Sequence, residues 1–544
     1  MVSKKEKRFQ TDVVVVGGGI SGIVCCLELL NLNKKVLLLE RDVPEKFGGL
    51  AKESFGGMFF VNSPLQKRAG IKDSTDLALS DWFAYADFGK TDEIPKKWAE
   101  NYVHRCTEEV HDWLKGLGIS FFPVVHWVER GLWQPGNSVP RFHMVWGTGY
   151  VLANTLIGHL KNHPKARNIQ IAFRHKVENI LFENGQIRGV SGIAEDSGES
   201  FRAEADVVVV ASGGINGSIE RVKENWYKPW GKAPAVILNG SHRFADGTLH
   251  DAAAAVGANI THLDKQWNYA AGIHHPKPDK PAHGLSLIPV KSALWLNFRG
   301  ERFGPMPLVS GFDTRFIVEQ ICRQEKKYSW QVMNLKIAAK EFSISGSEYN
   351  HAIREQRWLA FLKTILLGNK KLVNQLIEDC DDLVVGWSIE ELAEKMNALT
   401  GRQEVEVSLL KKSIETYDDQ IRRGKKYFND EQLRRIAHLR QYRGDRVRTC
   451  KFQPIFDKKA LPLIAIREFI LSRKTLGGIQ TDLQCRVLHK NGKPIEGLFA
   501  VGEAAGFGGG GIHGLRALEG TFLGGCVLTG RVAARTVGSY TAYG

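Results

Sequence analysis

One short segment near the start of the chain restricts the fold more than any other. Four valines at positions 13–16 run directly into Gly17-Gly18-Gly19-Ile20-Ser21-Gly22, and a second apolar run at 36–39 ends in Glu40. A run of β-branched residues without polar alternation predicts a strand buried on both faces, and the periodicity of residues 21–32 predicts a helix. Together these elements predict a β-α-β unit on a parallel sheet.

The glycines of this segment predict a dinucleotide site. Gly17, Gly19 and Gly22 fit the spacing G-x-G-x-x-G, which is a weak signal alone but a specific one between a strand and a helix. Such glycines allow a tight turn and close backbone approach, and the helix N-terminus at Ile20 and Ser21 faces a pyrophosphate. Glu40 can accept hydrogen bonds from a ribose diol. Nicotinamide and flavin dinucleotides both remain open at this point.

The rest of the chain predicts an insertion into this nucleotide-binding fold. Asn184-Gly185 stands between alternating apolar residues and predicts a hairpin, followed by the buried strand of residues 205–210. Mixed strands then extend to about Phe303, and charge-rich helices are expected from Arg315 to Arg440. Buried strands and glycines return after Phe452.

We therefore expect an α/β fold with two domains. A Rossmann-like domain with a parallel sheet and a small antiparallel insertion takes residues 1–230 and 451–544. An inserted α+β cap domain with a helical extension takes residues 231–450.

Composition narrows the class of protein. The 544 residues exceed one hydrophobic core, and eight scattered cysteines without a C-x-x-C pair indicate a reducing compartment and no metal site. The N-terminal sequence lacks the apolar region of a signal peptide, and no apolar run is long enough to cross a membrane, so a cytoplasmic location is expected. The net charge of +15 suits an anionic substrate or peripheral contact with an anionic membrane. Nucleic acid is not expected, because no binding motif accompanies the charge.

Later motifs connect the chain with a known superfamily. They are Phe47-Gly48-Gly49-Leu50, Ser54-Phe55-Gly56-Gly57, the strand ending in Ala211-Ser212-Gly213-Gly214, Ala245-Asp246-Gly247 and Gly497-Leu498-Phe499-Ala500-Val501-Gly502-Glu503. In order and spacing they resemble the flavoproteins that include fumarate reductase and 3-ketosteroid dehydrogenase, in particular bacterial FAD-binding dehydrogenases. The resemblance covers essentially the whole chain and implies a nucleotide domain of the glutathione-reductase type.

The resemblance implies FAD as the cofactor. It places Glu503 on the ribityl hydroxyls and the Val177 backbone on the adenine. Members with covalent flavin carry a histidine where this chain has Leu50, so the FAD is expected to be non-covalent. The residues expected to bind it are Gly17, Gly19, Ile20, Ser21, Gly22, Glu40, Arg41, Gly49, Leu50, Ser54, Gly56, Gly57, Val177, Ala211, Ser212, Gly213, Asp246, Gly502, Glu503, Gly520, Thr521 and Leu523.

The resemblance also implies the chemistry. A carbon–carbon bond beside a carbonyl or carboxylate gives a hydride to the flavin N5 and a proton to a protein base. Gln266-Trp267-Asn268-Tyr269 stands where fumarate reductases carry Gln-x-His, so Tyr269 is the candidate acid or base. The alternative for Tyr269 is a packing role against Trp267.

Three further residues are candidates for the active site. His513-Gly514-Leu515-Arg516 resembles the His-Gly and carboxylate-binding arginine of fumarate reductases, and Lys474 occupies the place of a substrate-binding histidine. Ketosteroid dehydrogenases carry a tyrosine where Arg516 stands, which argues against a steroid and for a keto-bearing or anionic substrate. Arg516 and Lys474, with Arg473, equally suit the flavin pyrophosphate or its N1 and O2 edge.

The sequence therefore predicts an FAD-dependent oxidoreductase acting on a small molecule, with an unidentified electron acceptor. Two alternatives stay open. One is the catalytic subunit of a membrane-attached electron-transfer complex, with the positive charge as a docking surface. The other is a flavin-binding redox protein without turnover.

Overall fold

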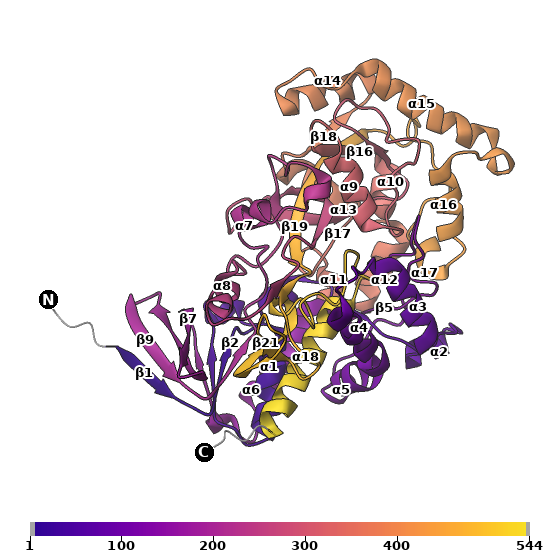
Figure 1. The fold of residues 1–544 in the computed structure, drawn as a ribbon. Coiled ribbons are helices and arrows are strands. Elements are labelled where there is room, and N and C mark those ends of the chain that lie inside the picture. Colours follow the sequence, from indigo (N-terminus) through magenta and orange to yellow (C-terminus); the bar gives the residue numbers. More distant parts are fainter. Residues whose placement is uncertain (1–5, 540–544) are drawn as a thin grey trace.

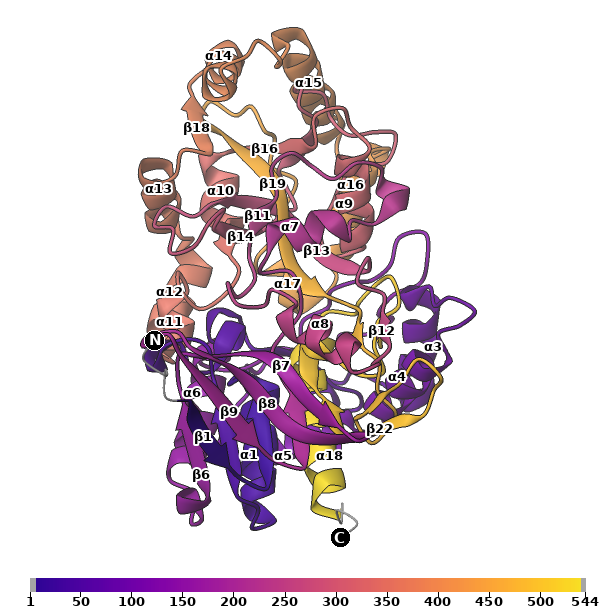
Figure 2. The same ribbon diagram turned by 60° about the vertical axis from the view of Figure 1, so that its left-hand side comes forward.

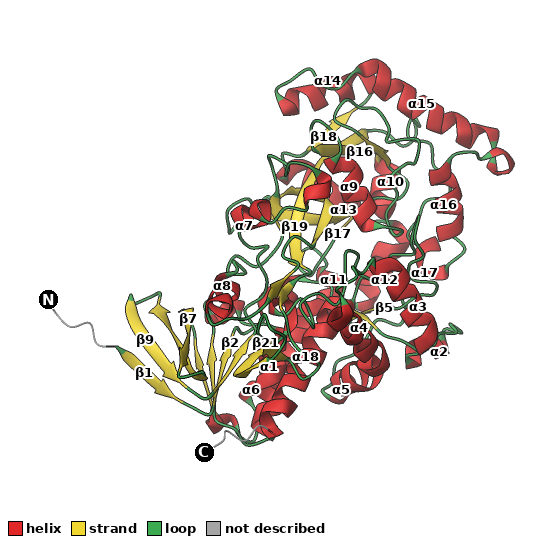
Figure 3. Ribbon diagram, viewed as in Figure 1, coloured by secondary structure: helices red, strands yellow, loops and turns green. Residues whose placement is uncertain are grey.

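A computed structural model of the chain describes residues 6–539. Figures 1 and 2 show a lower half and an upper half. The lower half contains both described ends of the chain, and helices α14 (Ile389–Thr400) and α15 (Val407–Arg423) lie at the top of the upper half. Figure 3 shows helices around the strands of the upper half, whereas the strands of the lower half lie at the left with most of the helices to their right.

A six-stranded sheet forms the centre of the lower half. Its order is β21-β22-β10-β2-β3-β6, and all neighbours run parallel except β21 and β22. The bounds are β21 (Arg486–Leu488), β22 (Pro494–Ala500), β10 (Val207–Val210), β2 (Val13–Val16), β3 (Val36–Leu39) and β6 (Ile169–Ala172). Every residue of β2, β3 and β10 is buried, as a sheet covered on both faces requires.

Helices cover one face of this sheet. Val13 and Val15 of β2 share a hydrophobic cluster with α1 (Ile20–Asn31), α6 (Thr148–Lys161) and α18 (Thr521–Ser539). The packing of α18 on α1 joins the end of the chain to its beginning. The expected β-α-β unit is therefore present, with β2, α1 and β3 in the predicted order.

A smaller sheet and α8 (Thr248–Ala255) cover the other face. The strand order is β1-β9-β8-β7, with β1 (Lys7–Gln10), β9 (Glu199–Glu204), β8 (Gln186–Ala194) and β7 (His175–Glu183). Asn184 and Gly185 both have positive φ, 53° and 79°, at the turn between β7 and β8, which is the backbone that a two-residue hairpin needs. The predicted hairpin is confirmed, and β7 forms one edge of its sheet.

The upper half is built on an eight-stranded sheet. Its main order is β15-β16-β19-β13-β14-β17, with β11 and β18 also paired to β19. The bounds are β11 (Leu238–Asn239), β13 (Gln266–His274), β14 (Gly284–Ile288), β15 (Leu294–Leu296), β16 (Tyr328–Asn334), β17 (Ser343–Ile344), β18 (Leu383–Gly386) and β19 (Leu463–Thr475). Figure 2 shows β19 running from the upper half down to the junction with the lower half.

One sequence expectation for this half is wrong, because the expected helical stretch from Arg315 to Arg440 also contains β16 and β18. Strand β19 follows the predicted domain boundary at Cys450 but pairs along its length with β13 and β16 of the upper sheet. These partners are far from β19 in the chain, so no local periodicity could reveal the pairing.

The remaining elements fill the surface and the junction. Two short pairs link distant segments: β4 (Gly57–Phe59) with β5 (Phe142–Met144), and β12 (Ile260–Thr261) with β20 (Gly478–Ile479). The other α-helices are α2 (Pro64–Arg68), α3 (Thr75–Ala86), α4 (Glu93–Arg105), α5 (Trp113–Gly116), α7 (Ile219–Glu224), α9 (Thr314–Cys322), α10 (Leu335–Glu341), α11 (His351–Arg354), α12 (Trp358–Leu367), α13 (Lys370–Asp379), α16 (Glu431–Leu439) and α17 (Arg443–Arg446).

Replacing Gly22 tests how tightly α1 packs on the turn before it. A Cβ at Gly22 would lie 2.0 Å from the Gly17 carbonyl oxygen, so Gly22→Ala should lower the free energy of unfolding by about 1–3 kcal/mol. Denaturant unfolding measures the change. Gly158→Ala in α6 is the control, because its Cβ meets nothing within 4 Å, and an unchanged midpoint for Gly22→Ala would contradict the close packing.

Candidate functional site

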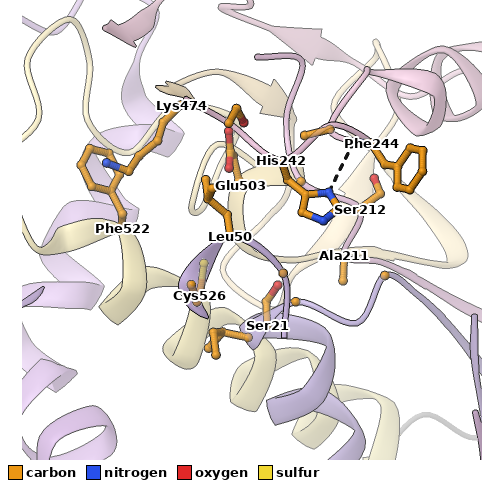
Figure 4. A pocket seen from close by; sticks show the side chains of 18 of the residues that line it. Ser21, Leu50, Ala211, Ser212, His242, Phe244, Lys474, Glu503, Phe522 and Cys526 are labelled. Atoms are coloured by element: carbon orange, nitrogen blue, oxygen red, sulfur yellow. Dashed lines mark hydrogen bonds between the residues drawn. The ribbon is translucent and has the colours of Figure 1, made fainter. Parts of the chain in front are cut away.

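A deep pocket lies at the junction of the two halves. Its empty volume, open mouth included, is about 1620 Å³. In Figure 4, Ser21, Ala211 and Ser212 lie toward one end of the pocket and Lys474 and Phe522 toward the other, with Leu50 and Glu503 between them. The lining therefore draws on both the N-terminal and the C-terminal segments.

The glycine-rich turn and the start of α1 form the first part of the pocket wall. Gly17 has φ 110°, and a Cβ there would lie 2.4 Å from the Ala211 carbonyl oxygen. A Cβ at Gly19 would meet nothing within 4 Å, so this side of the turn is open toward the pocket. Helix α1 begins without a side-chain cap and without an acidic residue in its first turn. Its N–H groups and positive dipole end therefore suit a pyrophosphate.

Glu40 follows β3 and lies against the same turn. Its Oε2 accepts a hydrogen bond from the Gly18 amide at 2.6 Å, and its Oε1 accepts one from the Asp42 amide at 2.7 Å. Each carboxylate oxygen keeps acceptor capacity for a hydroxyl. Val177 also lines the pocket and lies on β7, which is an edge strand of its sheet.

Arg41 and Asp246 also line this end of the pocket. The Arg41 Nη1 donates to Asp246 Oδ2 at 2.8 Å, and the guanidinium lies 4.2 Å from the centroid of the Phe244 ring. Arg41 also pairs with Glu195 at 3.0 Å, so two carboxylates hold its guanidinium in place at this polar part of the pocket wall.

Glu503 lines the middle of the pocket. Its Oε1 accepts a hydrogen bond from the Thr475 amide at 2.9 Å. Burial raises the pKa of Glu503 to about 7, against the lowering effect of that amide. A carboxyl in this environment is stabilised in its charged form by hydroxyl donors, which suits the polyol chain of a ligand.

Tyr269 joins two charged side chains at the far end. Its hydroxyl donates to Glu519 Oε1 at 2.6 Å and accepts from Lys474 Nζ at 3.1 Å. Burial, followed by the Glu519 carboxylate, raises the pKa of Tyr269 well above its ordinary value. Burial lowers the pKa of Lys474 to about 8, and the ammonium lies 4.0 Å from the centroid of the Phe522 ring.

The strands explain why these side chains meet. Trp267 and Tyr269 are two residues apart on β13 and therefore point to one side, where both donate to Glu519 Oε1, Trp267 at 2.7 Å. Lys474 on the neighbouring β19 is opposite Trp267, and a bulge separates that pair from Tyr269 and Leu471. Bulges of this kind redirect side chains in a sheet.

Most of the expected cofactor residues lie together in this pocket. They are Gly17, Gly19, Ile20, Ser21, Glu40, Arg41, Gly49, Leu50, Ser54, Gly57, Val177, Ala211, Ser212, Gly213, Asp246, Glu503, Gly520 and Leu523, with the candidates Tyr269 and Lys474. Expected residues that do not line it are Gly22, Gly56, Gly502 and Thr521.

The glycines outside the lining have steric roles. A Cβ at Gly22 would lie within 3.0 Å of Gly17, one at Gly56 within 3.0 Å of Gly149, and one at Gly502 within 3.0 Å of Ser21. Gly56 and Gly502 also have positive φ. They let neighbouring segments approach behind the pocket wall.

Arg516 and His513 do not reach the pocket, contrary to expectation. Arg516 is paired with Asp87 at 3.1 Å and with Asp313 at 3.4 Å. His513 is fully buried, stacks on Trp82, and lies 2.8 Å from the Thr521 hydroxyl. Burial lowers the pKa of His513 to about 3. Both side chains are held by partners that no local motif reveals.

Sequence reasoning missed Glu519 and Phe522. Glu519 lies directly before Gly520, which was singled out, but a lone glutamate in a loop carries no signal of its own. Its role depends on two donors from β13 that are about 250 positions away in the chain. Among residues 6–539 no group of three or more potential ligands suits a metal ion, and no helix is long and apolar enough to cross a membrane.

Known proteins are similar along the whole chain. A family model described as an FAD binding domain matches residues 12–523. The KsdD-like steroid dehydrogenase of Mycobacterium tuberculosis is 41% identical over 543 residues, which cover 96% of this chain and 95% of that protein.

Two solved structures share the fold. A 3-ketosteroid Δ1-dehydrogenase from Sterolibacterium denitrificans has a TM-score of 0.72 and 17% identity, covering 97% of this chain and 99% of that one. An open flavocytochrome c3 fumarate reductase has a TM-score of 0.69 and 20% identity, covering 98% of this chain and 78% of that one. The superfamily inferred from the sequence is confirmed.

Gly19→Ala separates ligand binding from folding. The added methyl group meets no protein atom within 4 Å, and Gly19 has φ −76°, which alanine adopts freely. It would instead occupy the space that a pyrophosphate needs. In isothermal titration of the apoprotein with FAD, the dissociation constant should rise at least about tenfold, which is a loss of roughly 1.4 kcal/mol in binding free energy. The midpoint of denaturant unfolding should not change. Equal FAD affinity of the variant and the wild type would show that this turn does not contact FAD.

Proposed function

The chain belongs to the FAD-binding family of flavoprotein oxidoreductases, and we propose that its substrate is an apolar ketone of steroid-like size. The enzyme dehydrogenates or reduces a carbon–carbon bond next to a carbonyl. The single observation that carries the proposal of an active site is the Lys474–Tyr269–Glu519 chain in the wall of the pocket.

The finer fold assignment is part of the same proposal. The strand order from β6 through β3, β2 and β10 to β22 matches that of a Rossmann nucleotide-binding sheet, with a small antiparallel sheet and α8 on the face opposite helices α1, α6 and α18. We assign the lower half to a Rossmann-like FAD domain of the glutathione-reductase type, and the upper half to an inserted cap.

The residues of the pocket fit non-covalent FAD. The Gly17–Gly19 turn and the start of α1 would hold the pyrophosphate, Glu40 the adenosine ribose, and Glu503 the ribityl hydroxyls. Leu50, where a covalent link would need a nucleophile, offers only an alkyl side chain. Bound there, FAD supplies the N5 position that accepts or returns the hydride.

The apolar part of the pocket lining favours an apolar substrate. Leu50, Phe55, Phe142 and Phe522 line the pocket together with the polar Tyr269. The relative from Mycobacterium tuberculosis is named as a steroid dehydrogenase. Arg516, which argued for an anionic substrate, is held by Asp87 and Asp313 instead, so that argument no longer applies. The tyrosine that ketosteroid dehydrogenases carry at position 516 is still missing, and the proposal therefore assigns the proton-transferring role to Tyr269.

Tyr269 is the proposed proton-transferring residue. Its raised pKa disfavours a free phenolate. As Tyr269 takes a proton from the substrate carbon, its own phenolic proton therefore passes to Glu519 Oε1 along the 2.6 Å hydrogen bond. The Lys474 ammonium stabilises the phenolic oxygen during this transfer. In the reducing direction the same protons move in reverse.

The cellular setting completes the proposal. All eight cysteines are free, which supports a cytoplasmic location. The substrate is a small molecule.

Anaerobic mixing of the purified holoenzyme with candidate substrates tests the function. A 3-ketosteroid should bleach the visible absorbance of the flavin, whereas succinate and hydroxy acids should leave it unchanged. Bleaching by succinate alone would overturn the proposed substrate class, and bleaching by none of them would favour the reducing direction, which reoxidation of reduced enzyme by an enone then tests.

Substitutions in the hydrogen-bonded chain test the mechanism. Tyr269→Phe should retain FAD and slow flavin reduction by about 10²- to 10⁴-fold, and Glu519→Gln should slow it in the same way because the proton acceptor is lost. Asp87→Asn is the control, since this half-exposed carboxylate lies outside the pocket. Full activity of both pocket variants in stopped-flow reduction would exclude the relay.

The lowered pKa of Lys474 predicts a pH profile. Below about pH 8 the ammonium is charged and donates to Tyr269; above it the charge is lost. The rate of flavin reduction should therefore fall at least roughly tenfold as the pH rises through 8. A tenfold fall corresponds to the free energy of one charge-assisted hydrogen bond. Lys474→Arg keeps its charge and should move this decline to higher pH. Identical profiles for both proteins would show that Lys474 does not control it.

A further inference from the structure

Helix α12, Trp358–Leu367, exposes an unusual amount of apolar surface. Leu359, Leu366 and Leu367 are 85%, 75% and 70% exposed, and Trp358 and Leu362 are 40% and 46% exposed. No residue of the helix is buried. Contiguous apolar surface of this kind usually marks an interaction site.

The helix is nevertheless firmly attached to the protein. Trp358 stacks on Trp146 with ring centroids 4.2 Å apart, and Phe361 packs edge-on against Phe122 at 5.2 Å. Just before the helix, the Gln356 Nε2 donates to the Trp146 carbonyl oxygen at 2.8 Å. One side of α12 thus fixes its position while the leucines of the other side face outward. Figure 2 places α12 at the outer edge of the molecule, between the two halves.

The surroundings of α12 are positively charged. No aspartate or glutamate occurs from residue 356 to residue 377, whereas Lys363, Lys370 and Lys371 do. All three lysines are exposed, and none has a carboxylate partner in the part of the chain that the structure describes. The nearby Glu355 is already paired with Arg354 and Arg357.

We propose that α12 docks the protein on an anionic phospholipid membrane, with its leucines among the acyl chains and the three lysines at the headgroups. A helix of ten residues extends about 15 Å, half of the roughly 30 Å hydrocarbon core, so it lies in the interface and does not span it. Unpaired lysines at its rim attract lipid phosphates. A second copy of the chain would bring the same uncompensated lysines together, so charge favours the membrane.

The docking helix is connected to the pocket by apolar side chains. Phe361 of α12 belongs to a cluster that also contains Phe55 and Phe142, and both of these phenylalanines line the pocket. If the proposed function holds, the part of the pocket lined by these phenylalanines lies close to the bilayer, and a lipophilic ketone reaches it from the membrane. The docking surface itself does not depend on that function.

Vesicle co-sedimentation of the holoprotein tests the proposal. Wild-type protein should pellet with vesicles of mixed phosphatidylglycerol and phosphatidylcholine, and less with phosphatidylcholine alone. The combined variant Leu359→Gln, Leu366→Gln and Leu367→Gln should lose at least about tenfold in partitioning. Lys363→Gln, Lys370→Gln and Lys371→Gln together should weaken binding and its dependence on salt.

A matched control changes three exposed apolar residues elsewhere, Val236→Gln, Trp387→Gln and Val407→Gln, which are 43%, 63% and 40% exposed. It should bind like wild type. Absence of wild-type binding to anionic vesicles, or equal binding by the leucine variant and the control, would overturn the proposal. So would a lipid-free dimer in sedimentation velocity that the leucine variant dissociates, because a second copy would then cover α12.

Flavin bleaching measured on the same proteins distinguishes failure of the docking proposal from failure of the proposed function. The leucine variant should retain FAD and be bleached by a water-soluble ketone as wild type is, since its changes lie outside the pocket. Loss of vesicle binding with unchanged bleaching supports docking through α12. Bleaching that fails for every protein, with intact vesicle binding, rejects the function and leaves the docking surface.

Discussion

The parallel pairing of four strands is the constraint on which the rest of the structure depends. Because β2, β3, β10 and β22 run in one direction, their carboxyl ends meet at one edge of the sheet. The residues that follow these ends are Gly17, Glu40, Ala211 and, after a short turn, Glu503. All four line the same pocket although they come from nearly the whole length of the chain.

Burial determines the chemistry at the opposite end of the pocket. Removing water raises the pKa of Tyr269 and lowers that of Lys474, so both groups are held nearer to their neutral forms. Hydrogen bonds join Lys474, Tyr269 and Glu519, and the proposed mechanism uses them to move a proton without a free phenolate. The upper sheet supplies two members of this chain and the loop before α18 supplies the third, so the chain lies where the two halves meet.

The pocket lining combines polar groups with apolar side chains. Its polar part consists of backbone amides, glycines and carboxylates at strand ends, and also of the Lys474–Tyr269–Glu519 chain. Its apolar part includes Phe55 and Phe142, which pack in one cluster with Phe361 of the exposed helix α12. For the proposed function, such a lining would let one pocket hold a charged dinucleotide and an apolar molecule side by side, each in surroundings that lower its desolvation cost.

The sequence by itself determined the elements whose signals are local. The valine runs, the G-x-G-x-x-G turn, Glu40 and the Asn184-Gly185 hairpin follow from periodicity and backbone preference within a few residues, and the later motifs identified the superfamily. Only the tertiary structure decided the partners that are distant in the chain. It placed β19 in the upper sheet, drew Arg516 and His513 away from the pocket, and brought Glu519 to Tyr269. Strand pairing and ion pairing join residues hundreds of positions apart, and no local pattern records which partner each side chain finds.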